Sequence, residues 1–368
     1  MKRIALALTL LFISLPISAH ASNAVTITAP SHRHLDGTFI DDKLSQELAP
    51  SGRLGQLVFL GTRYVTTWRV DPALLEDIQA MSQGYSVSGQ GEGVGKDVAI
   101  SWLNQFQRDI ANRRVEAIVY ANPSEYWVNK FFPHDRDFLL SVSGKRLSLL
   151  LNRVVGVPKN YDATNYFSLT QSQVRLLNIS NSRLAASASY MDSLELENYK
   201  LSTVKVLNPS LTATARQSLS YDLAGLVNQL RGSVRVSTGK FTITSTNQKL
   251  PVTVTNDFPQ QIVVDLLIHS TNERISVGDI SSVTIPGKSK VQVMVPITVF
   301  TSGDSGFSIT IKGRSGAVYG QTVIYPLKIA VISPIATWIT GAAGVVLLGA
   351  AILQSLRRLR KGKKVGTQ

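Results

Sequence analysis

The sequence predicts an α/β domain with the character of a degenerate or partial β/α barrel, followed by an immunoglobulin-like antiparallel β-sandwich and one transmembrane helix. Three observations predict this order. Short apolar strands alternate with amphipathic helices over residues 22–232, as in α/β layers. Apolar residues recur at every second position over residues 233–328, between turn-forming residues. Residues 329–356 contain no charge, over a length that exceeds the roughly 20 helical residues that cross a bilayer.

The first 21 residues have the pattern of a secretory signal peptide. Lys2 and Arg3 precede an apolar run, and Ala19 and Ala21 form the small-residue pattern of a cleavage site. Cleavage is therefore expected before Ser22. The alternative is an uncleaved anchor, for which the apolar run is short.

The α/β pattern is clearest where a strand runs into a helix at Asp71-Pro72. Asp is a preferred N-cap and Pro suits the first helical position, so the helix is expected to begin there. Further elements are expected as helices over 97–114, 138–156 and 209–232 and as a buried strand over 115–123. Residues 161–206 give no clear order of elements. The five glycines of Ser82–Lys96 match neither a Walker A nor a Rossmann loop, and they predict a mobile surface loop that could act as a lid.

The period-two pattern predicts the sandwich. Its alternating apolar pairs and triplets include Phe241/Ile243, Val252/Val254, Ile262/Val264/Leu266 and Phe307/Ile309/Ile311. The chain has no cysteine, so the prediction is immunoglobulin-like in architecture only, without a disulfide. A position directly before the membrane span suggests a stalk or adaptor.

The C-terminal tail, residues 357–368, sets the expected orientation. It carries six positive charges and no acid, and such clusters stay on the cytoplasmic side. The sequence therefore predicts a single-pass protein of the cell membrane, with the part N-terminal to the span on the extracytoplasmic side. The membrane-orienting residues are Arg357, Arg358, Arg360, Lys361, Lys363 and Lys364.

Charge and cysteine content exclude several classes of function. Of the net charge of +14, six charges lie in the tail and two in the signal peptide, which leaves +6 for the exported part. That excess is too small for a nucleic-acid-binding stripe, so no nucleic-acid partner is predicted. The absence of cysteine excludes thiol catalysis, iron–sulfur clusters and Cys-zinc sites. No cofactor is predicted.

Several stretches together resemble the DUF6049 family, an actinobacterial envelope family of unknown function. They are Asp36–Leu54, "TTWRVDPALLEDI", "SWLNQFQ", Phe241–Phe258 and "SVTIPGKSKVQVMVPI". Family members are often longer, so this chain looks like a short version. They are typically encoded beside the lipid II flippase, which implies a role in peptidoglycan or envelope assembly. The family tends to have an acidic "PY-x-D-x-D" after its second strand, whereas this chain has Asn122 and Ser124 there.

Asp71 and Glu125 are the candidate catalytic carboxylates. In α/β barrels the chemistry lies at the carboxyl ends of strands, where Asp71 is expected. A glycosidase needs a second carboxylate across the scissile bond, and Glu125 or Asp162 could supply it, although the spacing selects neither. The alternative role of Asp71 is structural, as the N-cap of the following helix, and it is favoured because a cap alone contributes ~1 kcal/mol.

The candidate ligand-binding residues are Asp71, Tyr126, Trp127, His134 and Asp135. The two aromatic residues could form a platform for a sugar ring. His134 and Asp135 are adjacent and lack a third ligand at metal-binding spacing, so no metal site is predicted, and Asp135 could instead cap a helix. The H-x-H pair of residues 32–34 also lacks a third ligand.

Two functions remain open at the sequence level. The favoured one is a non-catalytic, membrane-anchored envelope protein that binds cell-wall glycan or an envelope-assembly protein. The alternative is a carbohydrate-active hydrolase or a deacetylase-like enzyme that uses strand-end carboxylates such as Asp71. A second carboxylate facing Asp71 would favour the enzyme.

Overall fold

The computed structural model describes residues 23–60, 64–164, 166–331 and 334–362. Three parallel strands form its first sheet. The strands β1 (Ala24–Ile27), β2 (Thr67–Val70) and β5 (Arg114–Ala117) lie in the order β1-β2-β5. Because β2 pairs in parallel with both neighbours, all three carboxyl ends meet at one edge. The predicted α/β arrangement is confirmed. The described strands form an open sheet, so a barrel is not confirmed.

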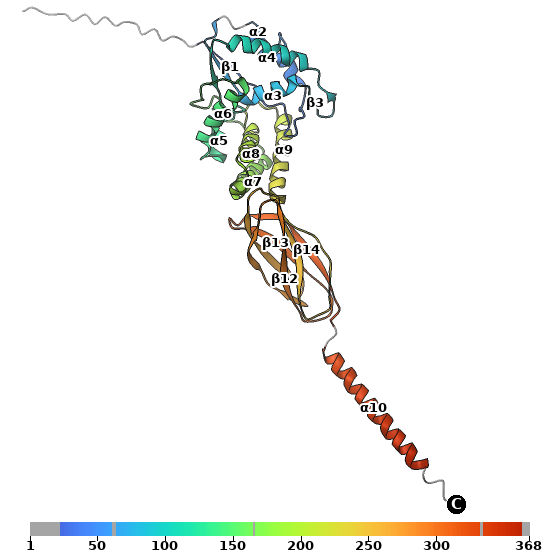
Figure 1. Ribbon diagram of the computed structural model, residues 1–368. Helices are drawn as coiled ribbons and strands as arrows, with labels where there is room; N and C mark the ends of the chain where they lie inside the picture. The colour runs from blue at the N-terminus through green and yellow to red at the C-terminus, as the bar shows by residue number, and fades with distance from the viewer. Residues whose placement is uncertain (1–22, 61–63, 165, 332–333, 363–368) are drawn as a thin grey trace, which may run out of the picture. The chain divides into compact units, whose positions relative to one another are not determined.

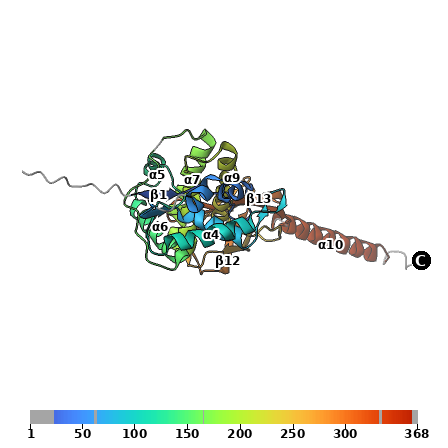
Figure 2. The ribbon, with the colours of Figure 1, turned by 90° about the horizontal axis from the view of Figure 1, so that it is seen from above.

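Six helices accompany this sheet in the part of the chain that the structure describes up to residue 151. They are α1 (Lys43–Leu48), α2 (Arg53–Phe59), α3 (Pro72–Ser82), α4 (Lys96–Ile110), α5 (Glu125–Phe131) and α6 (Arg136–Leu151). Helix α3 contacts α4 and α6, and Figure 1 and Figure 2 show these helices grouped around the sheet that contains β1. The helix expected over 97–114 is present as α4, and its inner face buries Trp102, Phe106 and Ile110 at helical spacing. The Phe106 ring stacks on Trp102 at 5.0 Å and meets Trp68 of β2 edge-on at 5.7 Å.

The glycine-rich segment between α3 and α4 contains a small hairpin. Its strands are β3 (Ser86–Val87) and β4 (Gly91–Glu92). The Tyr85 hydroxyl anchors the end of the segment, because it accepts a hydrogen bond from the Gly95 N–H at 2.9 Å and donates one to Asp42. A Cβ on Gly93 would lie 2.1 Å from the Tyr85 ring, so this glycine is required for close packing.

The chain divides into two compact units. Unit 1 comprises Met1–Ser168 with Val204–Leu219, and unit 2 comprises Leu169–Thr203 with Ser220–Gln368. The stretch that the sequence left unassigned contains α7 (Gln171–Ser187), the 3-10 helix η2 (Ala188–Tyr190) and α8 (Ser193–Lys205), and α9 (Ala213–Gly232) follows. Helix α7 begins with a capping box between Thr170 and Gln173.

Two largely antiparallel sheets make up the rest of unit 2 before the last helix. Their strands are β6 (Val234–Val236), β7 (Phe241–Ile243), β8 (Asn247–Asn256), β9 (Ile262–Ser270), β10 (Ile275–Val277), β11 (Ile280–Ile285), β12 (Ser289–Val299), β13 (Gly303–Gly313) and β14 (Val318–Ile329). The orders are β10-β12-β8-β6 and β11-β9-β13-β14-β7, in which only the β14–β7 pair is parallel. Period-two alternation therefore correctly predicted a β region here (Figure 1).

One hydrophobic core joins both sheets with helices α7, α8 and α9. It includes Val252 and Val254 of β8, Ile309 of β13, and Val227 and Leu230 of α9. The core of unit 2 therefore extends to residues that precede the β region. Helix α10 (Pro334–Gly362) follows β14.

Candidate functional site

Asp71 ties together the carboxyl ends of all three parallel strands. It follows β2, and its Oδ1 accepts hydrogen bonds from the backbone N–H of Ala73 and of Ala121, both at 2.9 Å. Its Oδ2 accepts a hydrogen bond from the hydroxyl of Thr28, just after β1, at 3.2 Å. Since Ala121 lies just beyond β5, one carboxyl group bridges three strand ends. The Ala73 bond makes Asp71 the N-cap of α3, with Pro72 at the first helical position.

The Asp71 carboxyl has no solvent-exposed surface. Burial raises its pKa from 3.8 to about 7, and the hydrogen bonds from Ala121, Ala73 and Thr28 oppose part of that rise because they stabilise the carboxylate. The negative charge of Asp77 raises the pKa further. Asp71 is thus placed to change its protonation state near neutral pH, inside the structure and without contact with solvent.

A second set of polar contacts surrounds this edge of the sheet. The Tyr120 hydroxyl donates a hydrogen bond to Glu76 of α3 at 2.6 Å, and Glu76 also pairs with Arg146 of α6 at 3.3 Å. Burial, followed by the charge of Glu76, raises the pKa of Tyr120 well above its usual value of 10. The Lys205 ammonium lies 5.9 Å from the centre of the Tyr120 ring. This network holds α3, α6 and the segment after β5 together.

Asp77 is the other buried acid of α3. Its carboxylate accepts hydrogen bonds from the Ser31 hydroxyl at 2.9 Å and from the Arg33 side chain at 3.0 Å. Sequence reasoning did not single out Asp77. The sequence nevertheless contained a signal that Asp77 is buried. It lies three residues after Leu74 and one before Ile78, on the apolar face of the helix, where a buried carboxylate needs a hydrogen-bonding or charged partner.

The chain turns sharply just after β5. Ala121 and Asn122 both have positive φ, at 61° and 42°, a region that residues other than glycine seldom adopt. The turn directs the Ala121 N–H to Asp71, while the Ala121 carbonyl accepts a hydrogen bond from Asn208 at 2.7 Å. These two hydrogen bonds therefore fix the backbone at this strand end. The chain does not have the acidic residues that the family pattern places there.

An aromatic cluster, formed by Tyr126, Trp127, Phe131, Tyr166 and Phe167, lies on α5 and the segment after residue 165. The Tyr166 ring stacks on Trp127 at 5.6 Å and meets Tyr126 edge-on at 5.0 Å. Tyr126 and Tyr166 are 47% and 61% exposed, whereas Trp127 is 4% exposed and its indole N–H donates to the Phe167 carbonyl at 2.8 Å. Trp127 therefore supports the cluster from beneath, and the two tyrosines form its exposed surface.

Charged groups lie next to this cluster. Glu125 pairs with Arg136 at 3.1 Å, and the Arg136 guanidinium lies 5.3 Å from the centre of the Tyr161 ring. The Lys130 ammonium lies 5.0 Å from the centre of the Trp127 ring. An exposed pair of tyrosines with cations and a carboxylate beside it can contact both apolar and polar parts of a ligand.

A family model, described as a family of unknown function (DUF6049), matches residues 145–364 of the chain. The match covers more than half of the sequence. The chain belongs to this family. The predicted resemblance is therefore confirmed. No curated protein matches the sequence of this DUF6049 chain.

Three similar solved structures each cover about a quarter of this DUF6049 member. The native conformation of E. coli alpha-2-macroglobulin is 13% identical over 26% of this chain and 6% of its own length, with a TM-score of 0.22. WR4, a C. elegans MSP family member, is 14% identical over 27% of this chain and 99% of its own length, with a TM-score of 0.22. The E. coli chaperone DraB is 13% identical over 28% of this chain and 58% of its own length, also with a TM-score of 0.22. These TM-scores are too low to establish a shared fold.

The structure separates the predicted site residues of this DUF6049 chain into different places. Asp71 contacts strand ends, whereas Glu125 pairs with Arg136, and Asp162 pairs with Arg69 at 2.6 Å. No described contact joins Asp71 to either acid. Glu76 is the acid that the sequence missed beside Tyr120, and only the fold brings the two together.

The histidine candidates do not form a metal site in the described part of this DUF6049 chain. His134 is exposed, and Asp135 occupies the N-cap position of α6 without a side-chain capping bond. His32 bonds Asp41 through Nδ1 at 2.7 Å. Among the described residues, no group of three or more His, Asp or Glu side chains could hold a metal ion.

Helix α10 of this DUF6049 chain contains one stretch that is long and apolar enough to cross a membrane, Trp338–Arg357. None of that stretch is buried, which is consistent with single-pass anchoring. The predicted signal peptide, residues 1–21, and Lys363 and Lys364 of the tail lie outside the described residues. The other predicted orienting residues lie within the range of α10: Arg357, Arg358, Arg360 and Lys361.

Proposed function

We propose that this chain is a single-pass, membrane-anchored envelope protein whose unit 1 lies outside the cell and binds cell-wall glycan. The anchor is supported by the exposed apolar stretch of α10, and the orientation by the basic tail that follows it. The signal-peptide pattern at the N-terminus supports export. Through this binding the protein takes part in peptidoglycan assembly, the role implied by the resemblance to an actinobacterial envelope family encoded beside the lipid II flippase.

The exposed surface of the aromatic cluster carries the proposal of glycan binding. Tyr126 and Tyr166 expose about half or more of their surface, yet their rings are held rigidly by contacts with each other and with the buried Trp127. Preordered rings lose little conformational entropy on binding, and a tyrosine offers an apolar face with a hydroxyl at its edge. The apolar faces and peripheral hydroxyls of a sugar ring complement this combination.

The alternative function, a hydrolase or deacetylase-like enzyme, has less support. Asp71 has no exposed surface in this conformation, and its oxygens already accept hydrogen bonds from Thr28, Ala73 and Ala121. A carboxylate that acts as acid or base must come within hydrogen-bonding reach of the substrate. Glu125 is partly exposed but bonded to Arg136.

Two finer features of the architecture are also part of the proposal. The two sheets of unit 2 form an immunoglobulin-like sandwich that acts as a stalk, supported by the core that both sheets share. The open parallel sheet of unit 1 is the remnant of a β/α barrel, supported by polar residues gathered at its carboxyl edge.

The test is sedimentation of the full chain, purified in detergent, with peptidoglycan sacculi. The double variant Tyr126→Ser/Tyr166→Ser should bind about tenfold more weakly, as expected when central aromatic contacts are removed. The matched control is Tyr64→Ser/Tyr221→Ser, because Tyr64 and Tyr221 are 72% and 69% exposed outside the cluster. Equal binding by the two double variants, or no binding by the wild type, would refute the proposal.

A further inference from the structure

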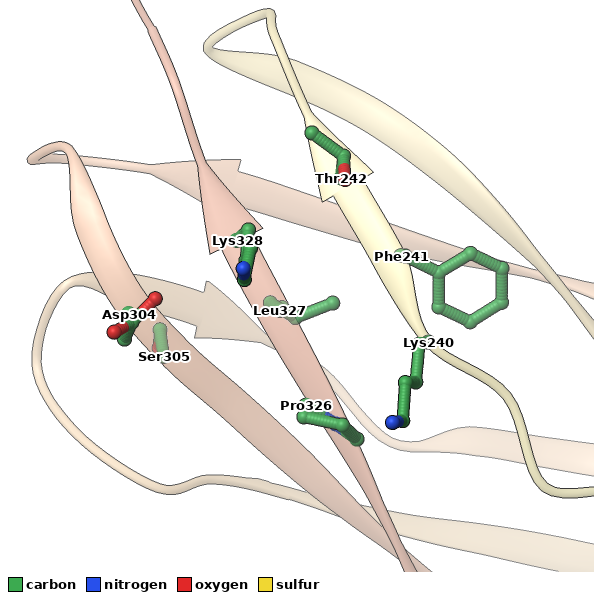
Figure 3. A pocket seen from close by; sticks show the side chains of 8 residues that line it. All are labelled: Lys240, Phe241, Thr242, Asp304, Ser305, Pro326, Leu327 and Lys328. Carbon is green, nitrogen blue, oxygen red and sulfur yellow. The ribbon is translucent and has the colours of Figure 1, made fainter.

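An open pocket of about 420 Å³ lies on the outer face of the five-stranded sheet in unit 2 (Figure 3). Its charged lining residues are Lys240, just before β7, Lys328 of β14 and Asp304 of β13. Lys328 is in register with Asp304 on one side and with Thr242 of β7 on the other. All three charged side chains are exposed, and none forms an ion pair with a described residue. The pocket thus carries one acid and two cations, which leaves a net positive charge.

An exposed aromatic ring and a further cation lie at the same end of the sheets. Phe300, which follows β12, is 64% exposed. Its backbone N–H bonds the carbonyl of Arg274 at 2.8 Å, and the Arg274 guanidinium bonds the carbonyl of Ser302 at 2.8 Å. Gly303, the next residue, pairs with Ile329, the last residue of β14. The pocket, Arg274 and Phe300 therefore share the end of unit 2 at which β14 leads to α10.

The length of the chain keeps this end close to the membrane. Four residues separate Ile329 from Pro334, the first residue of α10, and they span at most roughly 17 Å when fully extended. The apolar stretch begins at Trp338, about 6 Å further along the helix axis. The cations and Phe300 are thus tethered within reach of the bilayer surface.

We propose that this end of unit 2 is a membrane-contact surface, in which Lys240 and Lys328 bind the phosphate of an anionic lipid headgroup and Phe300 enters the interface. Basic side chains are attracted to an anionic leaflet, and aromatic rings are favoured at the level of the headgroups. The inference rests on the proposed anchoring by α10. Besides the α10 anchor, the β region would then have a second attachment to the membrane, which is selective for the lipid headgroup. This attachment would hold the β region against the bilayer, rather than leave it connected only through the short segment before α10.

The test uses the full chain in bilayer nanodiscs of phosphatidylcholine, with or without phosphatidylglycerol. Because the chain has no cysteine, Phe300→Cys provides a single site for an environment-sensitive fluorophore. Ile324→Cys is the matched control, since Ile324 is also 64% exposed but lies five residues before the end of β14. Iodide in the aqueous phase should quench the label at 300 several-fold less when phosphatidylglycerol is present, and should quench the label at 324 equally in both lipids.

Charge variants in the Phe300→Cys background test the pocket itself. Lys240→Gln/Lys328→Gln should restore quenching in phosphatidylglycerol discs. Lys290→Gln/Lys312→Gln removes the same charge from exposed lysines toward the opposite ends of β12 and β13, and it should leave the protection intact. Equal protection in both double variants would overturn the assignment of the pocket.

A label in the apolar stretch separates this inference from the function on which it rests. Val346→Cys should be shielded from iodide in every disc if α10 spans the bilayer. A shielded label at 346 together with an unprotected label at 300 would overturn the membrane-contact surface and leave the anchoring intact. A quenched label at 346 would overturn the anchoring, and the inference with it.

Discussion

Replacement of Asp71 by Asn should remove a pH dependence of stability that the fold creates. The pKa of Asp71 is about 7 in the folded protein and 3.8 in its ordinary environment. Between these values the native state retains a proton that the unfolded chain releases. The stabilisation that this retained proton on Asp71 adds to the free energy of unfolding is therefore complete below pH 3.8 and is lost as the pH rises through 7. The slope is about 1.4 kcal/mol per pH unit between the two pKa values and falls to half of that at pH 7, so the change amounts to ~2 kcal/mol between pH 5 and pH 7.

Asn should keep the structural role of Asp71. Its side-chain carbonyl can accept the hydrogen bonds of Ala73 and Ala121, and its amide can donate to the Thr28 hydroxyl. Urea unfolding of the full chain in detergent, followed by the fluorescence of the buried Trp68 and Trp102, measures the free energy of unfolding at each pH. The difference between wild type and Asp71→Asn should rise in favour of the variant from pH 5 to pH 7.

Asp71→Ala is the control that separates the charge from the hydrogen bonds. Alanine leaves the buried N–H groups of Ala73 and Ala121 without an acceptor, at a cost of about 1–3 kcal/mol each. The structure therefore predicts a larger loss than the ~1 kcal/mol of a helix cap alone. Identical pH slopes for wild type and Asp71→Asn would refute the account of Asp71 as a buried, neutral-pH titrating group.

Two further predictions follow from individual contacts. The bond to His32 lowers the pKa of Asp41 to about 2, so its contribution is present above pH 3.8 and is lost as the pH falls through 2. Asp41→Asn should therefore reduce the loss of unfolding free energy as the pH falls. The reduction is ~2 kcal/mol at most, because the Asp41 side chain is 25% exposed. An acid denaturation curve that is the same as for the wild type would contradict this prediction. A fragment of residues 220–331 should melt at a higher temperature than one of residues 233–331, because only the longer one keeps Val227 and Leu230 in the core. Equal melting temperatures in circular dichroism would count against that packing.

Local chemistry explains which parts of the structure could be predicted from the sequence. The start of α3 at Asp71-Pro72 depends on residues two positions apart, and the inner face of α4 depends on the helical repeat of Trp102, Phe106 and Ile110. The β region follows from alternation along each strand. The uncharged stretch of α10 is likewise a property of consecutive residues.

The sequence could not reveal contacts between residues far apart in the chain. Asp71 was correctly placed as a cap, but its bond to the N–H of Ala121, fifty positions later, exists only because β2 and β5 lie side by side. The pairing of Glu76 with Tyr120 arises from the same packing.

The sequence by itself determined where α3 begins, that a β region follows the helices, which family the chain belongs to and which stretch could cross a membrane, because each of these depends on neighbouring residues. Only the tertiary structure decided that Asp71 is fully buried, that Trp127 lies beneath Tyr166, and that Glu125 pairs with Arg136. Burial, electrostatic shifts and the exposure of a ring depend on the atoms that surround a side chain in space, and those atoms come from distant parts of the chain.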